Sequence, residues 1–588
     1  MRRLAGVVAL AGLAVLAAAT ARSGAAGSPG AAGTPGATGT PDGGTPDAHG
    51  SNDAAAMARI RPEAIRAHMR FLSDGLLEGR APDGRGYALA AAYVATQMEG
   101  LGLEPAGEKG SWQQPVPMRK ATLDEERSRF TLLRDGREER LTIATDWFTG
   151  GDVARGTTEV EGPVVFVGYG VTAPGRDYDD YRGIDAKGKI VAFFRGAPAS
   201  FPDTERAHYS NRFTKHTNAV AHGAVGTLNL DTPEFEKRYP WDWFLPQFRM
   251  GSIAWLEEGG QPRDVLTALK ASATLSLSGC ERLFRGAKRS ADQVFEDAKR
   301  GAVQPFDLPV RARLHLESRH TEFRSPNVLG LLRGGDPRLR NEVVVYTAHL
   351  DHLGLCPPVE GDNVCHGAYD NASGVATMLE VARAFTTLDP APRRSILFAA
   401  VTGEEKGLLG SDYLALHPVV ASARVDADIN IDSAPGLLLA TRDMVPLGAE
   451  HSTLRAPVEE AAREMGYEIG VDTHPEETYF IRSDQYSFVR AGVPAVCVTD
   501  GSKSAVPGVD ASETMLSWIR TRYHTPADRI DQPFDFESAA RAARLNYLIG
   551  SKVARADTAP AWNAGDFFGG LYVKGTAAAT GATSASGR

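Results

Sequence analysis

The sequence predicts an α/β fold in which a mostly parallel central sheet carries helices on both of its faces. Between residues 320 and 555, short apolar runs typical of strands alternate with segments whose apolar residues recur at helical spacing. Alternation of this kind indicates α/β layers around a mostly parallel sheet. The expected strands are 343–348, 396–401, 429–431 and 493–498, and the expected helices include 374–386 and 459–465.

Composition narrows the class of protein. The chain has 588 residues, of which 43% are hydrophobic and 23% charged, so a wholly disordered chain, a collagen and a polytopic membrane protein are excluded. The net charge is −9, and there is no dense block of Lys or Arg of the kind that binds nucleic acid. Four cysteines are too few for a disulfide scaffold.

The N-terminal residues are typical of an exported protein. Arg2 and Arg3 precede an apolar run over residues 4–19, and Ala19-Thr20-Ala21 offers a cleavage site, so residues 1–21 are expected to be a signal peptide. An uncleaved membrane anchor is the alternative, although the run is short and rich in alanine. Cleavage predicts a periplasmic or extracellular protein without stable membrane insertion.

Cysteine placement agrees with export. Cys356 and Cys365 lie nine residues apart in a Pro- and Gly-containing loop, where either a short disulfide or two free thiols is expected. Cys497 lies in an apolar strand and is expected to be a buried small hydrophobic residue.

Polar residues gather where three expected strands end. His349 and Asp351 follow the first, Glu404 and Glu405 the second, and Asp432 the third. Because ligands of open α/β sheets bind beyond the carboxyl ends of the strands, these side chains are expected to meet at one edge. A Gly-rich loop adds Asp370, and a late loop adds His524.

Such a set of carboxylates implies bound cations. Without compensation, these negative charges would repel one another strongly in a cleft of low dielectric constant. Nitrogen and oxygen ligands without thiolate favour zinc, with manganese or cobalt as alternatives. A lone carboxylate at a strand end is usually a cap or turn residue, but five at one sheet edge are harder to explain in that way.

These motifs resemble metallopeptidase family twenty-eight, a family of co-catalytic zinc exopeptidases that are mostly aminopeptidases. The matching motifs are His349-x-Asp351, Gly367-Ala-x-Asp370-Asn-Ala-Ser-Gly374, Gly403-Glu404-Glu405-x-Gly407, Asn430-x-Asp432 and Tyr523-His524-Thr-Pro-x-Asp528. They occur in the order and spacing of the family, which makes the resemblance specific over residues 310–555. Residues 60–117, which carry a motif at 71–82, resemble the N-terminal part of the same catalytic domain.

The resemblance implies the ligands of two zinc ions per chain. Asp370 would bridge the two ions, His349 and Asp432 would complete one site, and Glu405 and His524 the other. His352 and His366 also lie in these motifs, and we expect each to be a supporting or rim residue because five ligands already satisfy two open sites.

The resemblance also implies catalytic roles. Glu404 would be the general base for a metal-bridging hydroxide, and Tyr523 would donate to the developing oxyanion. Asp351 would accept a hydrogen bond from His349 and fix its tautomer. The Asp370–Asn371 peptide bond is expected to be cis, and Asp484 is expected to support the site.

Composition and resemblance together divide the chain. The expected parts are a signal peptide (1–21), a disordered Gly/Pro/Ala/Thr linker (22–55), the N-terminal part of the catalytic domain (56–148), a β-rich protease-associated-like insert (149–310), the main part of the catalytic domain (311–555) and a low-complexity tail (556–588).

The expected function is that of a secreted dizinc aminopeptidase that hydrolyses peptide or protein N-termini. The choice of aminopeptidase over carboxypeptidase rests on the frequency of the two in the family. Two alternatives share the fold: a glutaminyl cyclase-like enzyme, which generally works with one zinc ion, and a receptor-like binding protein without catalysis. The oligomeric state and the side-chain specificity are not legible in the sequence.

Overall fold

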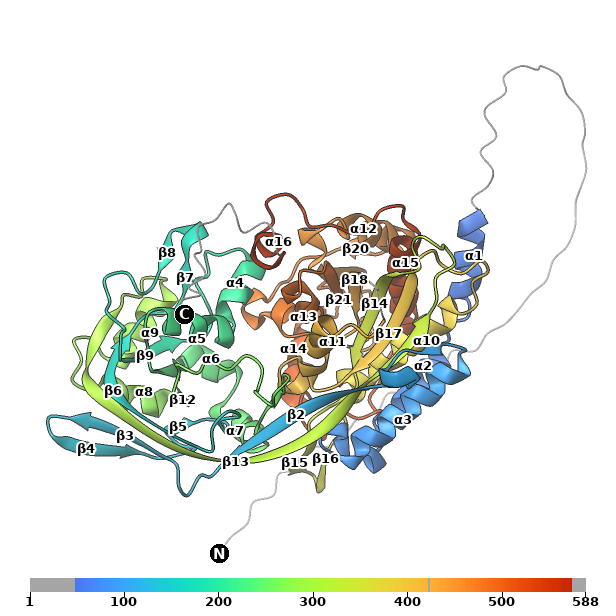
Figure 1. Ribbon diagram of the computed structural model, residues 1–588. Coiled ribbons are helices and arrows are strands. Elements are labelled where there is room, and N and C mark those ends of the chain that lie inside the picture. Colours follow the sequence, from blue (N-terminus) through green and yellow to red (C-terminus); the bar gives the residue numbers. More distant parts are fainter. Residues whose placement is uncertain (1–47, 421–423, 574–588) are drawn as a thin grey trace, which may run out of the picture. The chain divides into compact units, whose positions relative to one another are not determined.

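The protein is represented by a computed structural model that describes residues 48–420 and 424–573 (Figure 1). The expected signal peptide lies outside the described residues, as do most of the expected linker and the last part of the expected tail. From His49 onward the described residues belong to one compact unit.

The central sheet has four parallel strands in its middle. Their order is β17 (Ser395–Val401), β14 (Glu342–His349), β18 (Arg424–Asn430) and β21 (Ala495–Asp500). Each overlaps a strand expected from the sequence. Antiparallel neighbours flank them: β13 (Phe306–Leu332) pairs with β17, and β19 (Asp443–Leu447) pairs with β21. The sheet continues beyond β13 through β2 (Gln113–Leu123) and β11 (Ser252–Trp255), while β1 (Glu104–Pro105) pairs with β13 and β20 (Glu468–Ile469) with β19.

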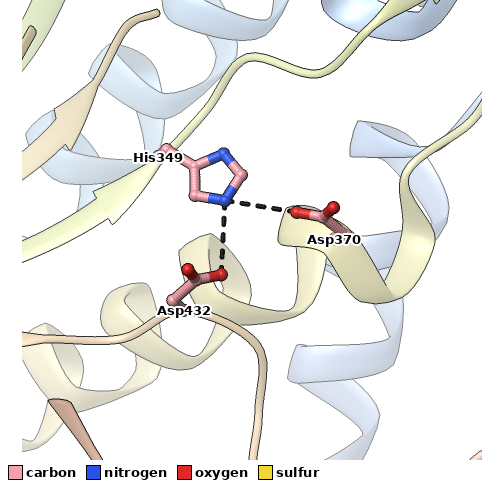
Figure 2. Close-up of side chains that lie close together, drawn as sticks. All are labelled: His349, Asp370 and Asp432. Atoms are coloured by element: carbon pink, nitrogen blue, oxygen red, sulfur yellow. Dashed lines mark hydrogen bonds and ion pairs between the residues drawn. The ribbon is translucent and has the colours of Figure 1, made fainter. Parts of the chain in front are cut away.

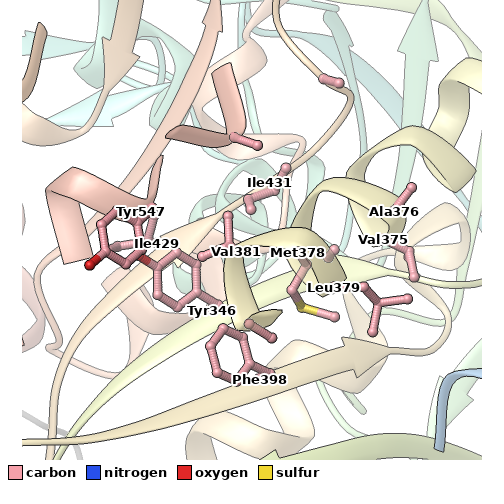
Figure 3. Packing of buried hydrophobic residues seen from close by; sticks show 14 of the residues in the cluster. Tyr346, Val375, Ala376, Met378, Leu379, Val381, Phe398, Ile429, Ile431 and Tyr547 are labelled. Carbon is pink, nitrogen blue, oxygen red and sulfur yellow. The ribbon is translucent and has the colours of Figure 1, made fainter. Parts of the chain in front are cut away.

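Both faces of this sheet are buried, as β14 illustrates. Successive side chains of a strand point to opposite faces. Val344 and Tyr346 pack in the core on one face, and Val343 and Val345 in the core on the other. Figure 3 shows the first of these cores, where Tyr346 lies among side chains of helix α10 and the neighbouring strands. A strand buried on both faces reads as a continuous apolar run, which is why β14 was visible in the sequence.

Helices cover each face, which confirms the expected fold class. One face is packed by α2 (Pro62–Leu72), α3 (Arg85–Gly100), α10 (Ser373–Phe385), α12 (Arg455–Glu464) and α15 (Phe536–Arg555). The other is packed by α11 (Leu409–Leu416), α13 (Gln485–Arg490) and α16 (Phe567–Tyr572).

A second sheet is built on the same long strand. The N-terminal half of β13 pairs with β3 and β6, and its C-terminal half with β2 and β17, so one strand belongs to both sheets (Figure 1). The order of the second sheet is β4 (Arg137–Leu141), β3 (Arg129–Arg134), β13, β6 (Thr157–Phe166), β9 (Ile190–Phe194), β10 (Gly226–Leu230), β12 (Ala271–Leu275) and β5 (Trp147–Phe148).

The inserted segment has a mixed secondary structure, with helices as well as strands. The segment between the strands of the second sheet also contains helices α4 (Asp203–Ser210), α5 (Arg212–Ala221), α6 (Pro233–Arg238), α7 (Trp241–Arg249), α8 (Leu277–Phe284) and α9 (Ala291–Lys299). These helices are short, and several are mostly polar, so their periodicity is weak in the sequence. The likeness to a protease-associated domain is not confirmed. The second sheet also begins at β3, before the expected boundary at residue 149.

The expected linker and tail both extend too far into the chain. Helix α1 (Ala48–Met57) lies partly in the expected linker, and the carboxylate of Asp53 accepts hydrogen bonds from Tyr547 Oη and Arg555 Nη1, each at 2.6 Å. In the expected tail, Phe568 of α16 is fully buried, and Trp562 Nε1 donates to the Gly492 carbonyl at 2.8 Å. The first part of the expected tail is thus packed against the domain by aromatic residues, although its composition resembles that of a linker.

The structure settles the cysteine alternatives. Cys356 and Cys365 form a disulfide across the hairpin of β15 (Gly354–Val359) and β16 (Asp362–Cys365). Cys280 and Cys497 are free and buried, as expected for Cys497.

Among the described residues, no helix has the length and apolar content needed to cross a bilayer.

We predict that Gly550→Ala destabilises the protein. Gly550 lies in α15 against β14, and an added Cβ would lie 1.9 Å from Tyr346 Oη, which is buried and donates to the Asn546 carbonyl. Alanine gains ~1 kcal/mol in helix propensity, but overpacking costs ~1–3 kcal/mol. A separation of 1.9 Å is a severe overlap, so the overpacking cost is expected at the upper end of that range, and urea unfolding should show a net loss of up to ~2 kcal/mol. The control is Gly100→Ala, at the exposed end of α3 with open space around it, and unchanged stability in both variants would contradict this packing.

Candidate metal centre

The expected site residues converge at the carboxyl edge of the parallel strands. His349 is the last residue of β14, Glu404 and Glu405 open the 3-10 helix η5 (Glu404–Lys406) after β17, and Asp432 follows β18. Because β17, β14 and β18 are parallel neighbours, their ends lie at the same edge. Asp370 comes from the π-helical turn η4 (Ala368–Ala372).

Three of these residues form a first cluster. His349 Nε2 lies 3.2 Å from Asp370 Oδ1 and 3.3 Å from Asp432 Oδ1. Figure 2 shows the imidazole at the end of its strand with both carboxylates turned toward it. One nitrogen and two carboxylate oxygens so close together form a group able to hold a metal ion.

The second oxygen of Asp370 faces a second cluster. Asp370 Oδ2 lies 3.3 Å from His524 Nε2, which is also 3.1 Å from Glu405 Oε2. His352, expected to be a supporting or rim residue, joins this cluster, since its Nδ1 lies 2.6 Å from Glu405 Oε1 and 3.9 Å from Asp370 Oδ2. The carboxylate of Asp370 is therefore shared between the two clusters.

Several nitrogen and oxygen atoms of the second cluster are buried without hydrogen-bond partners in the described part of the chain. Among the described residues, Glu405 Oε1, His524 Nε2 and both ring nitrogens of His352 are buried without a hydrogen-bond partner. A buried polar atom without a partner costs free energy unless something else satisfies it. These nitrogen and oxygen atoms lie close together without forming hydrogen bonds, which is the arrangement expected for ligands of a common cation. The residues present therefore fit a metal centre.

Asn371 holds the turn of Asp370 against the loop of Asp432. Its Nδ2 donates to the Ile431 carbonyl at 3.0 Å, and its Oδ1 accepts from the backbone N–H groups of Ser433 and Gly374, each at 2.8 Å. A Cβ on Gly374 would lie 2.2 Å from Asn371 Oδ1 and 2.3 Å from the Ile431 oxygen. The peptide bond between Asp370 and Asn371 is cis, as expected.

Arg80 supports the same edge from the N-terminal part of the chain. The side chain is fully buried, and its guanidinium donates to the carbonyls of Leu72, Leu350, His366 and Gly367. Burial lowers the pKa of Arg80 to about 10, while Asp370 and Asp528 raise it, so the group stays charged at neutral pH. The sequence motif around Arg80 was recognised, but no role at the site was assigned to it.

Asp528 fixes the backbone of the Asp370 turn. Its carboxylate accepts hydrogen bonds from the N–H groups of Tyr369 at 2.9 Å and Asp370 at 3.1 Å. Asp528 closes the motif that supplies His524, so this contact joins the loops of two expected ligands. The sequence showed the motif without showing this function.

The expected hydrogen bond from His349 to the Asp351 side chain is absent. His349 Nδ1 instead lies 3.1 Å from the backbone carbonyl of Asp351, while Asp351 Oδ1 accepts from the Glu404 N–H at 3.1 Å. The tight turn after β14 brings the carbonyl, and not the carboxylate, to the ring. Asp351 therefore connects the β14 end to the β17 end.

At the Ser483-Asp484 motif, the serine makes the direct contact. Ser483 Oγ donates to Asp432 Oδ2 at 2.7 Å, and the Asn430 amide donates to Ser483. Asp484 is fully buried, and burial raises its pKa to about 6. His366 lies away from both clusters, since its ring contacts the Ser73 carbonyl and the Asp362 carboxylate.

Burial and mutual repulsion dominate the electrostatics. Burial raises the pKa of Glu404 well above its ordinary value, and Asp432 and Glu405 raise it further, although His349 opposes them. Burial likewise raises the pKa of Asp351 to about 7. Burial and Glu405 oppose ionisation of Asp370, but the adjacent imidazoles of His349 and His524 outweigh them and lower its pKa.

Tyr523 lies beside the second cluster. Its ring stacks on that of His524 with centroids 3.7 Å apart, and its hydroxyl lies 3.3 Å from Arg482 Nη2. Burial raises the pKa of Tyr523 well above its ordinary value, so its hydroxyl keeps its proton. A cavity of about 220 Å³ opens beside Tyr523, Glu404 and the first cluster.

Comparison with known proteins identifies the family of the region that carries the clusters. Residues 327–549 match the family described as Peptidase family M28. The chain contains a peptidase family M28 domain. This domain carries every residue of the two clusters, and the family match ends before α15 does.

The curated relatives match parts of the chain. A "Probable zinc metalloprotease" of Leptosphaeria maculans is 35% identical over 22% of this chain and 28% of its own length. Another, of Pyrenophora tritici-repentis, is 26% identical over 40% of this chain and 52% of its own length. The chain thus spans about half of these relatives or less. Among solved structures, an aminopeptidase from Aneurinibacillus sp. strain AM-1 is 18% identical, covering 85% of this chain and 95% of its own, with a TM-score of 0.49.

We predict that Arg80→Lys destabilises the M28 domain. A lysine ammonium cannot reproduce the planar fork that reaches four buried carbonyls, and each carbonyl left without a partner costs ~1–3 kcal/mol. The free energy of unfolding, measured with a chelator present, is expected to fall by about 2–4 kcal/mol. Arg85→Lys, at an exposed position of α3, is the matched control, and equal stability of the two variants would contradict the role of Arg80.

Proposed function

We propose that the chain is an exported aminopeptidase that holds two zinc ions and removes residues from the N-termini of peptides. The observation that carries this proposal is the position of Asp370, whose two oxygens face two separate clusters of nitrogen and oxygen atoms. A single carboxylate placed in this way suits a pair of divalent cations, with zinc favoured and manganese or cobalt as alternatives.

The proposed ligands divide between the two ions. His349 and Asp432 would hold one ion, Glu405 and His524 the other, and Asp370 both, with His352 next to Glu405. When bound, paired cations lower the pKa of water toward ~7 and polarise a carbonyl group.

Glu404 is the proposed general base. It lines the cavity, and its backbone N–H donates to Asp351 Oδ1 at 3.1 Å. Its carboxylate lies outside the proposed ligand set, so it can take a proton from the attacking water and then deliver it to the leaving amine. Tyr523 keeps its proton and can donate a hydrogen bond to the oxyanion that develops on the substrate carbonyl.

The cavity suits the N-terminal end of a peptide. Its wall includes the apolar side chains of Leu438, Leu439, Val445, Leu447, Met515 and Ile519, which can receive the first side chain of the substrate. Asp472 and Asp500 line the same cavity outside both clusters, and these carboxylates favour the ammonium of a free N-terminus over a C-terminal carboxylate.

The first test concerns the end of the substrate. We predict that the purified chain binds two zinc ions, that it cleaves aminoacyl-nitroanilides with a free amine, and that chelation abolishes and zinc restores the activity. Acetylated substrates are the control. Equal cleavage of acetylated substrates would reject an aminopeptidase, and one zinc ion with cyclisation of N-terminal glutamine would indicate a glutaminyl cyclase-like enzyme.

The second test concerns Glu404. Glu404→Gln keeps the size of the side chain but removes the base, so we predict a rate lower by ~10²–10⁴ with metal content unchanged. Glu126→Gln, an exposed change outside the M28 domain, is the matched control and should retain full activity. Loss of metal from Glu404→Gln would show instead that Glu404 is a ligand.

A further inference from the structure

We infer that helix α7 of the inserted segment completes the metal centre, with Gln247 as a positioning residue for His524 and Trp243 as its cover. The inference rests on the proposed function, because it requires His524 to be a metal ligand. It concerns residues far outside the matched family region, which begins at residue 327.

Helix α7 is fixed in place from the side of the second sheet. Phe148 of β5 packs on the rings of Trp241 and Phe248, with centroids 4.2 and 3.7 Å away. Trp241 Nε1 also donates to the Ala144 carbonyl at 2.7 Å. Two aromatic contacts and a hydrogen bond therefore set the orientation of the helix.

The segment before α7 is tied to the M28 domain. Arg238 Nη1 donates to Glu477 Oε1 at 2.6 Å, and Tyr239 Oη donates to the other oxygen of the same carboxylate. The Glu477 side chain is 4% exposed, so this pair lies in a region of low dielectric constant, where a charged hydrogen bond is strong. Tyr239 and the nearby Arg482 also line the cavity beside the clusters.

These anchors place Gln247 against the outer nitrogen of His524. Gln247 Nε2 lies 3.3 Å from His524 Nδ1, while Nε2 of the imidazole points into the second cluster. An imidazole that binds metal through Nε2 carries its proton on Nδ1, and that N–H needs an acceptor. Because the oxygen and nitrogen of an amide exchange places by a rotation, Gln247 can present Oε1 to this proton.

Trp243 covers the same imidazole. The two ring planes are nearly parallel, at 2°, with centroids 5.9 Å apart, and Trp243 also lies 6.3 Å from the Tyr523 ring. The indole therefore borders the outer side of the proposed ligand.

Metal affinity tests this inference in the full-length chain. Metal-free protein is titrated with zinc by calorimetry against a competing chelator, and the wild type is expected to show two binding steps. Gln247→Met keeps the length of the side chain but removes the acceptor, so one step should weaken ~10–100-fold while the other stays unchanged. Gln247→Glu keeps an acceptor and should bind both ions at least as tightly as the wild type.

The matched control is Gln261→Met, a glutamine of the same inserted segment that is exposed to solvent. It should leave both steps unchanged. The inference is overturned if Gln247→Met binds both ions within twofold of the wild type, or if Gln247→Met and Gln247→Glu weaken binding equally, as a purely structural role would require.

The experiment separates this inference from the proposed function. Two zinc sites with the expected response to Gln247→Met, in a chain that cleaves no peptide, would refute the peptidase and support the positioning role. An active peptidase whose zinc affinity is unchanged by Gln247→Met would refute the positioning role alone.

Discussion

The sharing of one carboxylate between two clusters is the constraint on which the rest of the site depends. Asp370 turns one oxygen toward His349 and the other toward His524, residues that stand 175 positions apart in the chain. Carboxylates packed this closely repel one another unless cations bind between them. The surrounding structure therefore has to hold the Asp370 turn from several directions at once.

That support comes from side chains that are neither proposed metal ligands nor proposed catalytic residues. Asn371 fastens the turn to the loop after β18, Asp528 accepts its backbone N–H groups, and Arg80 gathers carbonyls from three segments around it. Each of these side chains is buried and hydrogen-bonded to backbone, so each fixes a loop rather than a single atom. The parallel strands bring the proposed ligands to one edge of the sheet, and these contacts set the distances between the ligands.

Much of this was visible in the sequence, for a physical reason. Strands buried on both faces leave continuous apolar runs, and ligands at strand ends follow those runs directly, so β14 and His349 could be predicted together. Contacts made by backbone carbonyls leave no such signal, which is why the Asp351 side chain was given the wrong partner. Gln247 was missed because neither helical period nor motif links it to His524 across 277 positions.

The central claim, two cations sharing Asp370, is tested most directly by diffraction from crystals grown with zinc, using data collected on both sides of the zinc absorption edge. The account predicts two anomalous peaks ~3.5–4 Å apart, one on each side of the Asp370 carboxylate. A single peak, or two peaks that do not both adjoin Asp370, would contradict it.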